Sequence, residues 1–366
     1  MKIAIVHDWL VTYAGAERCL EQMLVLYPDA DLFSLVDFLG DDERGFILGK
    51  KARTSFIQKL PRARDRYRSY LPLMPYAIER FDLSGYDLVI SSSHAVAKGV
   101  RTGEGQKHIC YCYTPIRYAW DLRDQYLREA GLDRGVKGFM AGRVLDYIKA
   151  WDLSTSQRPD AYIGISKYIA DRIKRAYGRD ASVIYPPVDI DMYALRQDKD
   201  DYYLTASRMV PYKKIPLIVE AFSRMPDKNL IVIGDGPEMP KARARAAGNV
   251  QFMGWQPGGA LREHMQRARA FVFAAEEDFG IVPVEAQACG TPVIAYGRGG
   301  AVETLVDGVT GLFFKEQSVE SIVEAVHRFE SMPGKFVPAS IRNNAMQFNA
   351  ERFRREFKAL VDSIIT

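Results

Sequence analysis

Short apolar runs rich in β-branched residues alternate with amphipathic stretches along most of this 366-residue chain. Runs that are apolar at nearly every position are typical of strands buried on both faces, and the stretches between them can supply the covering helices. The alternation therefore predicts parallel sheets covered by helices, which is the α/β class. The expected strands are 3–6, 31–34, 88–91, 108–112, 161–165, 182–185, 203–206, 229–233, 250–252, 270–274, 292–295 and 311–314.

A proline pair followed by a charged stretch interrupts this alternation. The segment Pro186-Pro187-Val188-Asp189 cannot continue a core strand, and residues 197–201 are mostly charged, so together they are typical of a linker. The strand–helix pattern then starts again. We expect two tandem Rossmann-like doubly wound domains, residues 1–188 and 189–349. Because ligands bind at the carboxyl ends of such sheets, we expect the active site in a cleft between the two domains.

Composition and targeting signals favour a cytoplasmic protein. No run approaches 18 consecutive apolar residues, so no membrane span is expected. The first apolar run ends at His7 and lacks a small-residue cleavage site, which argues against a signal peptide. The four cysteines are too few and too scattered for a disulfide scaffold, as expected in a reducing compartment.

The basic residues cluster in one window. The segment 50–80 holds nine basic residues and two acidic ones, although the whole chain has a net charge of only +4. Aromatic and aliphatic residues interleave with these charges. Such a segment can lie on anionic lipid, bind nucleic acid, or form an ordinary solvated face. We weigh two interpretations equally: contact with a membrane or a lipid-linked partner, and an ordinary solvated face. Binding to nucleic acid is disfavoured.

The segment 271–300 carries the strongest sign of chemistry. It predicts a strand, an acidic loop at 276–280, and a helix that begins near Pro283, since proline is favoured at the first helical position. A loop that enters a helix offers free backbone N–H groups to an anion. We expect these groups at Gly280, Ile281 and Val282.

Two carboxylates flank that expected anion site. Glu277 precedes the helix and Glu285 lies within it, so they can accept hydrogen bonds from sugar hydroxyls on either side of a diphosphate. A nucleotide sugar has this layout of sugar, diphosphate and ribose. Taken singly, each glutamate is more typical of an exposed loop or a helix surface, and only the whole strand–loop–helix–strand unit favours a binding role.

A basic loop follows the strand at 203–206. Arg208 and Lys213 lie five residues apart across a turn, so both can reach a diphosphate at the edge of the sheet. The strand at 229–233 ends in a glycine-containing turn with Gly236 and Pro237, where the backbone can approach a ligand closely. This turn lacks the third glycine of the dinucleotide-binding fingerprint.

These segments resemble the retaining family-4 glycosyltransferases. The similarity rests on 277–285 as the E-x7-E signature, the ACGTPVIA run, Gly299-Gly300, the Arg208…Lys213 pair, the GDGP turn and the run ASVIYPPVD at 181–189. The amino-terminal half resembles the mannosyltransferase-type members, through the HDWL…GAE start and the run CYCYTPIRYAWD at 110–121. Together the matching segments cover nearly the whole chain.

The resemblance implies a GT-B fold with an acceptor-binding first domain, a nucleotide-sugar-binding second domain, and a last helix, 350–366, that packs back on the first. The family pattern assigns Glu277 to the transferred sugar, Glu285 to the ribose, and Arg208 and Lys213 to the diphosphate. It brings Gly15 close to the donor phosphates. It places Tyr113 and Arg117 against the sugar or the acceptor.

The implied reaction moves a hexose onto a lipid-linked saccharide. GDP-mannose is the favoured donor, with a UDP-sugar as the alternative. No cofactor and no metal are expected, because the two cations and the helix terminus supply positive charge. The triplet Asp189-Ile190-Asp191 falls in the linker, and Cys110 and Cys112 have no second Cys or His pair nearby.

One departure from the family pattern concerns Tyr113, where related sequences commonly carry histidine. Tyrosine can donate a hydrogen bond but is a poor proton shuttle near neutral pH. A non-catalytic protein that binds sugar nucleotides therefore stays open, and a GT-B epimerase acting on them is a separate alternative. The sequence leaves the oligomeric state undetermined.

Overall fold

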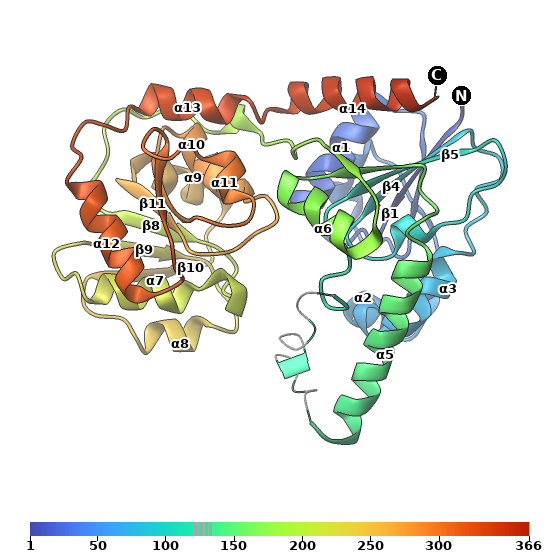
Figure 1. Ribbon diagram of the computed structural model, residues 1–366, viewed down its shortest axis with the longest axis horizontal. Helices are drawn as coiled ribbons and strands as arrows, with labels where there is room; N and C mark the ends of the chain where they lie inside the picture. The colour runs from blue at the N-terminus through green and yellow to red at the C-terminus, as the bar shows by residue number, and fades with distance from the viewer. Residues whose placement is uncertain (121–122, 124–126, 129–130, 132–133, 366) are drawn as a thin grey trace. The chain divides into compact units, whose positions relative to one another are not determined.

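The computed structural model describes residues 1–120, 123, 127–128, 131 and 134–365. It divides the chain into two compact units, Met1–Pro186 with Phe353–Thr366, and Pro187–Arg352. Figure 1 shows one sheet in each unit, and every strand pair identified in these sheets is parallel. The end of the tyrosine-containing run noted above, Asp121, lies outside the described residues.

The first unit contains a seven-stranded sheet with the order β3-β2-β1-β4-β5-β6-β7. The strand order reverses between β1 and β4, because β2 and β3 lie on one side of β1 and the later strands lie on the other. The strands are β1 Ile3–His7, β2 Asp31–Ser34, β3 Arg53–Thr54, β4 Leu88–Ser93, β5 Lys107–Cys112, β6 Ala161–Gly164 and β7 Ala181–Val183.

Helices and short turns cover this sheet. The helices are α1 Gly15–Leu26, α2 Ala63–Arg66, α3 Met74–Ile78, α5 Gly135–Ser154, α6 Lys167–Tyr177 and α14 Ala350–Ile365. The 3₁₀ turns are Asp41–Ile47, Phe56–Lys59, Tyr67–Leu73 and Ala97–Gly99. The carboxyl-terminal part of α14 belongs to this unit: Phe353 and Phe357 pack against Tyr111 of β5, with ring centroids 5.7 and 6.1 Å apart.

The second unit contains a six-stranded sheet with the order β10-β9-β8-β11-β12-β13. Its order reverses between β8 and β11. The strands are β8 Tyr203–Ala206, β9 Leu230–Ile233, β10 Val250–Gly254, β11 Ala270–Phe273, β12 Val293–Tyr296 and β13 Gly311–Phe314. The helices are α7 Ile215–Ser223, α8 Met239–Arg243, α9 Gly258–Arg267, α10 Ile281–Ala288, α11 Ala301–Thr304, α12 Val319–Glu330 and α13 Pro338–Met346, with 3₁₀ turns at Ile190–Met192 and Pro211–Lys213.

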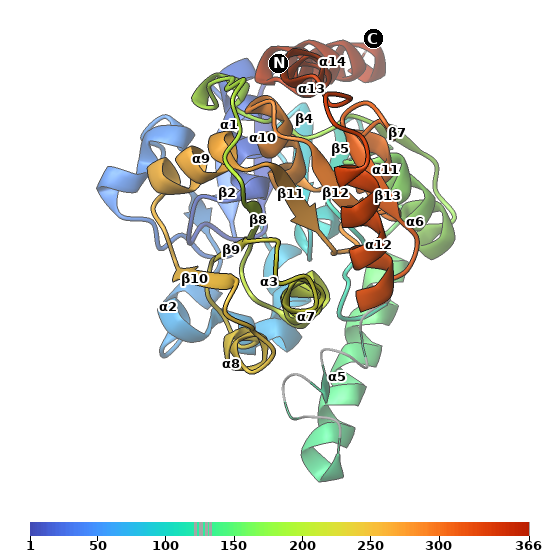
Figure 2. The same cartoon turned by 90° about the vertical axis from the view of Figure 1, so that its left-hand side faces the viewer.

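The core of the second unit follows from strand alternation. Val272, Ile294 and Leu312 point to one face of the sheet, where they pack against buried residues of α7 and α12 such as Phe222 and Val326. Figure 2 shows α7, α8 and α12 on one side of β8 and β9 and α10 on the other. Since both faces are covered, the strands are apolar at nearly every position.

The basic segment 50–80 does not lie on the surface along its whole length. Its interleaved apolar side chains Ile57, Tyr67 and Met74 are buried in the core of the first unit, and Leu60, Tyr70 and Leu71 pack against that core. Phe56 and Leu73 reach the surface, with 39% and 41% of their area exposed. Most of the apolar character of this segment therefore serves folding.

Candidate functional site

The predicted donor-binding residues of the second unit lie after β8 and β11, except Gly236 and Pro237, which follow β9. The neighbouring strands β8 and β11 flank the point where the strand order reverses. In open α/β sheets, the crevice outside the strand ends at such a point is where ligands bind. The loop after β8 carries Arg208 and Lys213, and the loop after β11 carries Glu277.

Lys213 and Glu277 are brought into direct contact. The Lys213 ammonium forms an ion pair with Oε1 of Glu277, and only 16% and 15% of the two side chains are exposed. Lys213 ends the 3₁₀ turn Pro211–Lys213, and Lys214 then adopts a left-handed conformation, with φ of +57°, before α7 begins. Arg208, on the same loop, is exposed. The loop thus offers one paired cation and one solvent-facing cation.

The turn after β9 is tied to this basic loop through the backbone. The amide of Met209 donates to the carbonyl of Asp235 at 2.8 Å, and the amide of Glu238 donates to the carbonyl of Met209 at 3.0 Å. A Cβ atom on Gly236, which has φ of +150°, would lie 2.6 Å from the Met209 carbonyl oxygen. Only glycine therefore allows this approach. Pro237, at the tip of the turn, is exposed.

The acidic loop is held by the loop after β12. The amide of Gly300 donates to the carbonyl of Glu277 at 2.7 Å. A Cβ atom on Gly300 would lie 2.3 Å from Cα of Phe279, and one on Gly299 would lie 2.4 Å from the Glu277 carbonyl oxygen. These glycines let the two loops pack backbone to backbone, which fixes the position of Glu277.

Helix α10 begins earlier than the sequence suggests, at Ile281 rather than near Pro283. Gly280 precedes it in a left-handed conformation with φ of +86°. The amides of Gly280, Ile281 and Val282 therefore lie at the helix start, where backbone N–H groups lack helical partners and the helix dipole favours an anion. Glu285 lies inside the same helix and is 4% exposed.

The remaining predicted residues lie in the first unit. Gly15 is the first residue of α1. The Tyr113 hydroxyl donates to the carbonyl of Ala16 at 2.8 Å and lies 2.9 Å from the Ser92 hydroxyl oxygen. Burial raises the pKa of Tyr113 well above its usual value, so this hydroxyl stays protonated and ties β5 to α1. Arg117 is half-buried after β5.

A buried carboxylate at the end of β1 escaped the sequence analysis. Asp8 accepts hydrogen bonds from four successive backbone amides, those of residues 94–97, at 2.6 to 2.9 Å. Its Oδ2 atom also lies 3.2 Å from Nδ1 of His94, whose side chain is 27% exposed. This pair spans β1 and β4, where the strand order of the first sheet reverses. The HDWL run after the first strand was the available signal.

Next to this pair, His7 contacts Glu17 of α1. Their Nε2 and Oε1 atoms lie 3.4 Å apart, and both side chains are buried. Burial raises the pKa of Glu17, but the hydrogen bond and charge of His7 outweigh it, so the net shift lowers the pKa. The carboxyl ends of the central strands β1 and β4 are therefore lined by polar and charged side chains.

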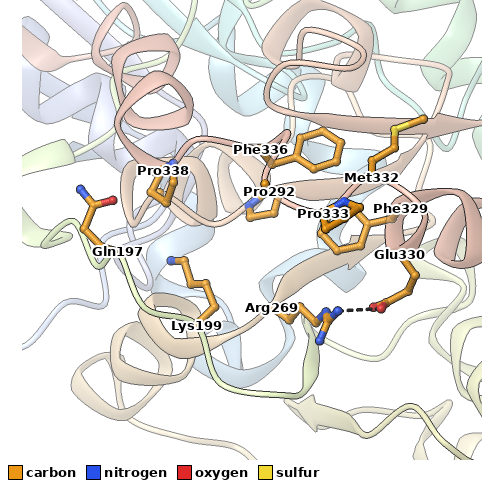
Figure 3. Close-up of a pocket in the computed structure, with 12 residues that line it drawn as sticks. Gln197, Lys199, Arg269, Pro292, Phe329, Glu330, Met332, Pro333, Phe336 and Pro338 are labelled. Atoms are coloured by element: carbon orange, nitrogen blue, oxygen red, sulfur yellow. Dashed lines mark hydrogen bonds and ion pairs between the residues drawn. The ribbon is translucent and has the colours of Figure 1, made fainter.

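A cavity of about 210 Å³ lies elsewhere in the second unit, as Figure 3 shows. Its lining includes Arg269 before β11 and Pro292 before β12, so it opens at the amino ends of the strands. Arg269 is paired with Glu330 at 2.6 Å. The Lys199 ammonium donates to three neutral oxygen atoms, those of Gln266, Cys289 and Thr291. This cavity is distinct from the loops that carry Lys213 and Glu277.

In the part of the chain that the structure describes, no three His, Cys, Asp or Glu side chains are grouped so that they could hold a metal ion. Among the same residues, no helix combines the length and the apolar character needed to cross a bilayer.

Family models match both halves of the chain. Residues 192–350 match glycosyl transferases group 1, and residues 36–192 match Glycosyltransferase Family 4. The two matches together run from residue 36, just after β2, to residue 350, the first residue of α14.

Two curated relatives are similar over part of the chain. A GDP-mannose-dependent alpha-(1-6)-phosphatidylinositol monomannoside mannosyltransferase of Mycolicibacterium smegmatis is 31% identical over 198 residues, which cover 46% of this chain and 52% of that protein. A D-inositol 3-phosphate glycosyltransferase of Kribbella flavida is 30% identical over 42% of this chain and 43% of its own length. The chain thus spans about half the length of the curated relatives it matches.

Solved structures share the fold over the whole chain. Sucrose-phosphate synthase from Thermosynechococcus elongatus superposes with a TM-score of 0.73 at 17% identity, covering 99% of both chains. Anabaena HepE in complex with UDP-glucose gives a TM-score of 0.69 at 18% identity, covering 99% of this chain and 100% of that one. These structures establish the two-domain GT-B architecture of the present chain.

Proposed function

We propose that this chain, which belongs to the family-4-type glycosyltransferases with a GT-B fold, transfers a hexosyl group from a nucleoside diphosphate sugar to a saccharide hydroxyl. The observation that carries the proposal is the arrangement after β8 and β11. Two cations on one loop lie beside an acidic loop that leads directly into the start of α10. A pyrophosphate needs such cations and free amides, and the hydroxyls beside it need carboxylate acceptors.

The ion pair between Lys213 and Glu277 suggests how the donor binds. The Glu277 carboxylate is the counter-ion of Lys213 in the structure. A diphosphate carries more negative charge and takes over Lys213, which leaves Glu277 to accept a hydrogen bond from the transferred sugar. Arg208 adds a second, solvent-accessible cation that can contact the diphosphate through two N–H groups.

During transfer, the bond between the anomeric carbon and the diphosphate oxygen breaks, and negative charge grows on the leaving group. Arg208, Lys213 and the amides at the start of α10 stabilise this charge, which lowers the barrier. The family pattern implies retention. The acceptor hydroxyl then attacks from the side of the leaving group, the new glycosidic bond forms there, and the departing diphosphate takes the hydroxyl proton. Glu285 holds the ribose of the donor.

We propose GDP-mannose as the donor and a lipid-linked saccharide as the acceptor. The name of the mycobacterial relative supports both choices, because it is GDP-mannose-dependent and acts on a phosphatidylinositol monomannoside. The HepE complex contains UDP-glucose, so UDP-hexoses are the alternative donors. A lipid-linked acceptor places the enzyme in the cytoplasm at the inner face of the membrane.

The test is a transfer assay with GDP-mannose, UDP-glucose and UDP-galactose, each offered with water-soluble and lipid-linked saccharides. The proposal predicts a new glycoside, detected by mass spectrometry, together with release of nucleoside diphosphate. Binding of a donor without transfer to any acceptor would favour the non-catalytic alternative, and isomerised donor sugar would favour the epimerase.

A further inference from the structure

The first half of α5 exposes a set of large apolar side chains. Val136, Phe139 and Met140 have 77%, 72% and 64% of their area exposed, and Tyr147 has 47%. Because residues three, four and seven positions apart lie on the same side of a helix, these four side chains form one stripe. In Figures 1 and 2, this half of α5 extends away from the sheet of the first unit.

The second half of α5 anchors the helix, so the exposed stripe is not needed for packing. Leu145 and Ile148 are buried. Asp152 forms a buried ion pair with Lys98 at 2.8 Å and accepts a hydrogen bond from the Trp120 indole at 2.8 Å. A fixed helix therefore projects its apolar residues into solvent. Clusters of this kind mark surfaces that bind a protein or a membrane.

The charges around the stripe indicate whether a protein or a membrane is the better partner. Arg134, just before the helix, and Lys137 and Arg143 within it are exposed. No acidic residue follows Arg134 until Asp146, which is paired with Arg123. Two copies that met through this surface would bring like charges together. An anionic lipid surface is complementary, since its headgroups attract cations while the acyl boundary accepts Phe, Met and Val side chains.

The basic segment 50–80, for which the sequence left a lipid contact and a solvated face equally open, is a weaker candidate. Its cations are comparable, but most of its apolar side chains lie in the core, as with Ile57 and Met74. In α5 the apolar residues and the cations both face solvent. The two surfaces therefore make different predictions for variants that remove exposed apolar groups.

We propose that residues 134–143, which comprise Arg134 and the first half of α5, dock the protein on anionic bilayers. Val136, Phe139 and Met140 enter the boundary between headgroups and acyl chains, and Arg134, Lys137 and Arg143 contact lipid phosphates. This surface deepens the proposed function, because a lipid-linked acceptor is presented at such a bilayer. The docking itself is a binding property that can be measured without any transfer reaction.

The experiment is sedimentation of the full chain with vesicles of phosphatidylcholine alone, or mixed with phosphatidylglycerol, at low and high salt. We expect binding to the anionic vesicles only, weakened by salt. The double variant Phe139→Ser, Met140→Ser should lower the bound-to-free ratio by about tenfold or more. Lys137→Gln with Arg143→Gln should lower it by a similar factor.

The matched control is Phe56→Ser with Leu73→Ser, which removes two of the exposed apolar residues of the basic segment and should bind like the parent. Thermal unfolding confirms that each variant is folded, and donor binding in the absence of vesicles should stay unchanged. The proposal is overturned if the α5 variants bind like the parent, or if only the control variant loses binding. It is also overturned if the α5 variants change the oligomeric state in ultracentrifugation while vesicle binding persists.

Discussion

Lys213 and Glu277 form an ion pair between the loops that follow β8 and β11, the two strands at which the order of the second sheet reverses. Both side chains are largely shielded from solvent. Shielding strengthens the attraction between the charges, but it also makes either charge costly to leave alone. In the proposed donor complex, the diphosphate offers Lys213 a new counter-ion, and a sugar hydroxyl donates a hydrogen bond to Glu277.

The first prediction concerns the two cations of the loop after β8. Replacing Arg208 by alanine, or Lys213 by alanine, should lower turnover on the order of a hundredfold or more, because the leaving diphosphate loses its stabilisation. The measurement is kcat for transfer, with circular dichroism to confirm the fold. Arg224→Ala removes an exposed cation of the same unit, one paired with Glu220 and Glu320, and should leave turnover unchanged. Near-normal turnover in both loop variants would discard the phosphate assignment.

The second prediction separates binding from chemistry at Glu285. Because a ribose contact is present before and during transfer, Glu285→Ala should raise the donor KM by about tenfold and change kcat little. Glu285→Gln keeps the size of this buried side chain and removes its charge, so it controls for packing. An unchanged KM in both variants would show that Glu285 only fills space in α10.

The third prediction concerns the stability of the first unit. Asp8→Ala removes the acceptor of four backbone amides and leaves them unsatisfied in the interior. We expect the free energy of unfolding to fall by about 3 to 5 kcal/mol, measured by urea denaturation. Asp82→Ala, at an exposed turn, should cause little change. Equal midpoints for the parent and Asp8→Ala would refute the structural role of this carboxylate.

Individual strands and helices show how much of this fold the sequence predicts. The strands 31–34, 203–206 and 311–314 were predicted with the observed bounds, because each is a short apolar run between clear breaks. Strand β3 was missed, since two residues, Arg53 and Thr54, at a sheet edge give no periodic signal. The start of α10 was placed too late because the proline rule points to Pro283, whereas Gly280 turns the chain before Ile281.

The site itself was less accessible to sequence reasoning. Glycines and charges after strands indicated which loops matter, but pairing between them depends on strand order, which one sequence does not display. Thus the contact between Lys213 and Glu277 and the four amides around Asp8 required the structure. Likewise, the amphipathic appearance of the segment 50–80 came from residues such as Tyr67 that pack inside.

The fourth prediction concerns pH and the buried His108. Its Nε2 atom lies 2.8 Å from the Ser91 hydroxyl, and burial, with Lys98 and Arg158 nearby, lowers its pKa to about 3. An unfolded histidine has a pKa of about 6.5. As pH falls below 6.5, the unfolded chain gains a proton that the folded chain does not.

Stability should therefore fall as the pH decreases, with His108 contributing up to about 2 kcal/mol between pH 6.5 and pH 5. Urea denaturation at the two pH values measures this loss. A folded His108→Gln variant should lose less stability over the same interval, because it has no group to protonate there. An identical loss in the parent and the variant would show that His108 does not contribute.

The most direct test of the account is isothermal titration calorimetry of the parent chain and Lys213→Ala with GDP-mannose, GDP and UDP-glucose. We expect saturable, one-site binding of a nucleoside diphosphate hexose to the parent, weakened by about tenfold or more in Lys213→Ala. If the folded parent takes up no GDP- or UDP-linked hexose, the loops after β8 and β11 do not form a donor site, and the proposed activity is contradicted.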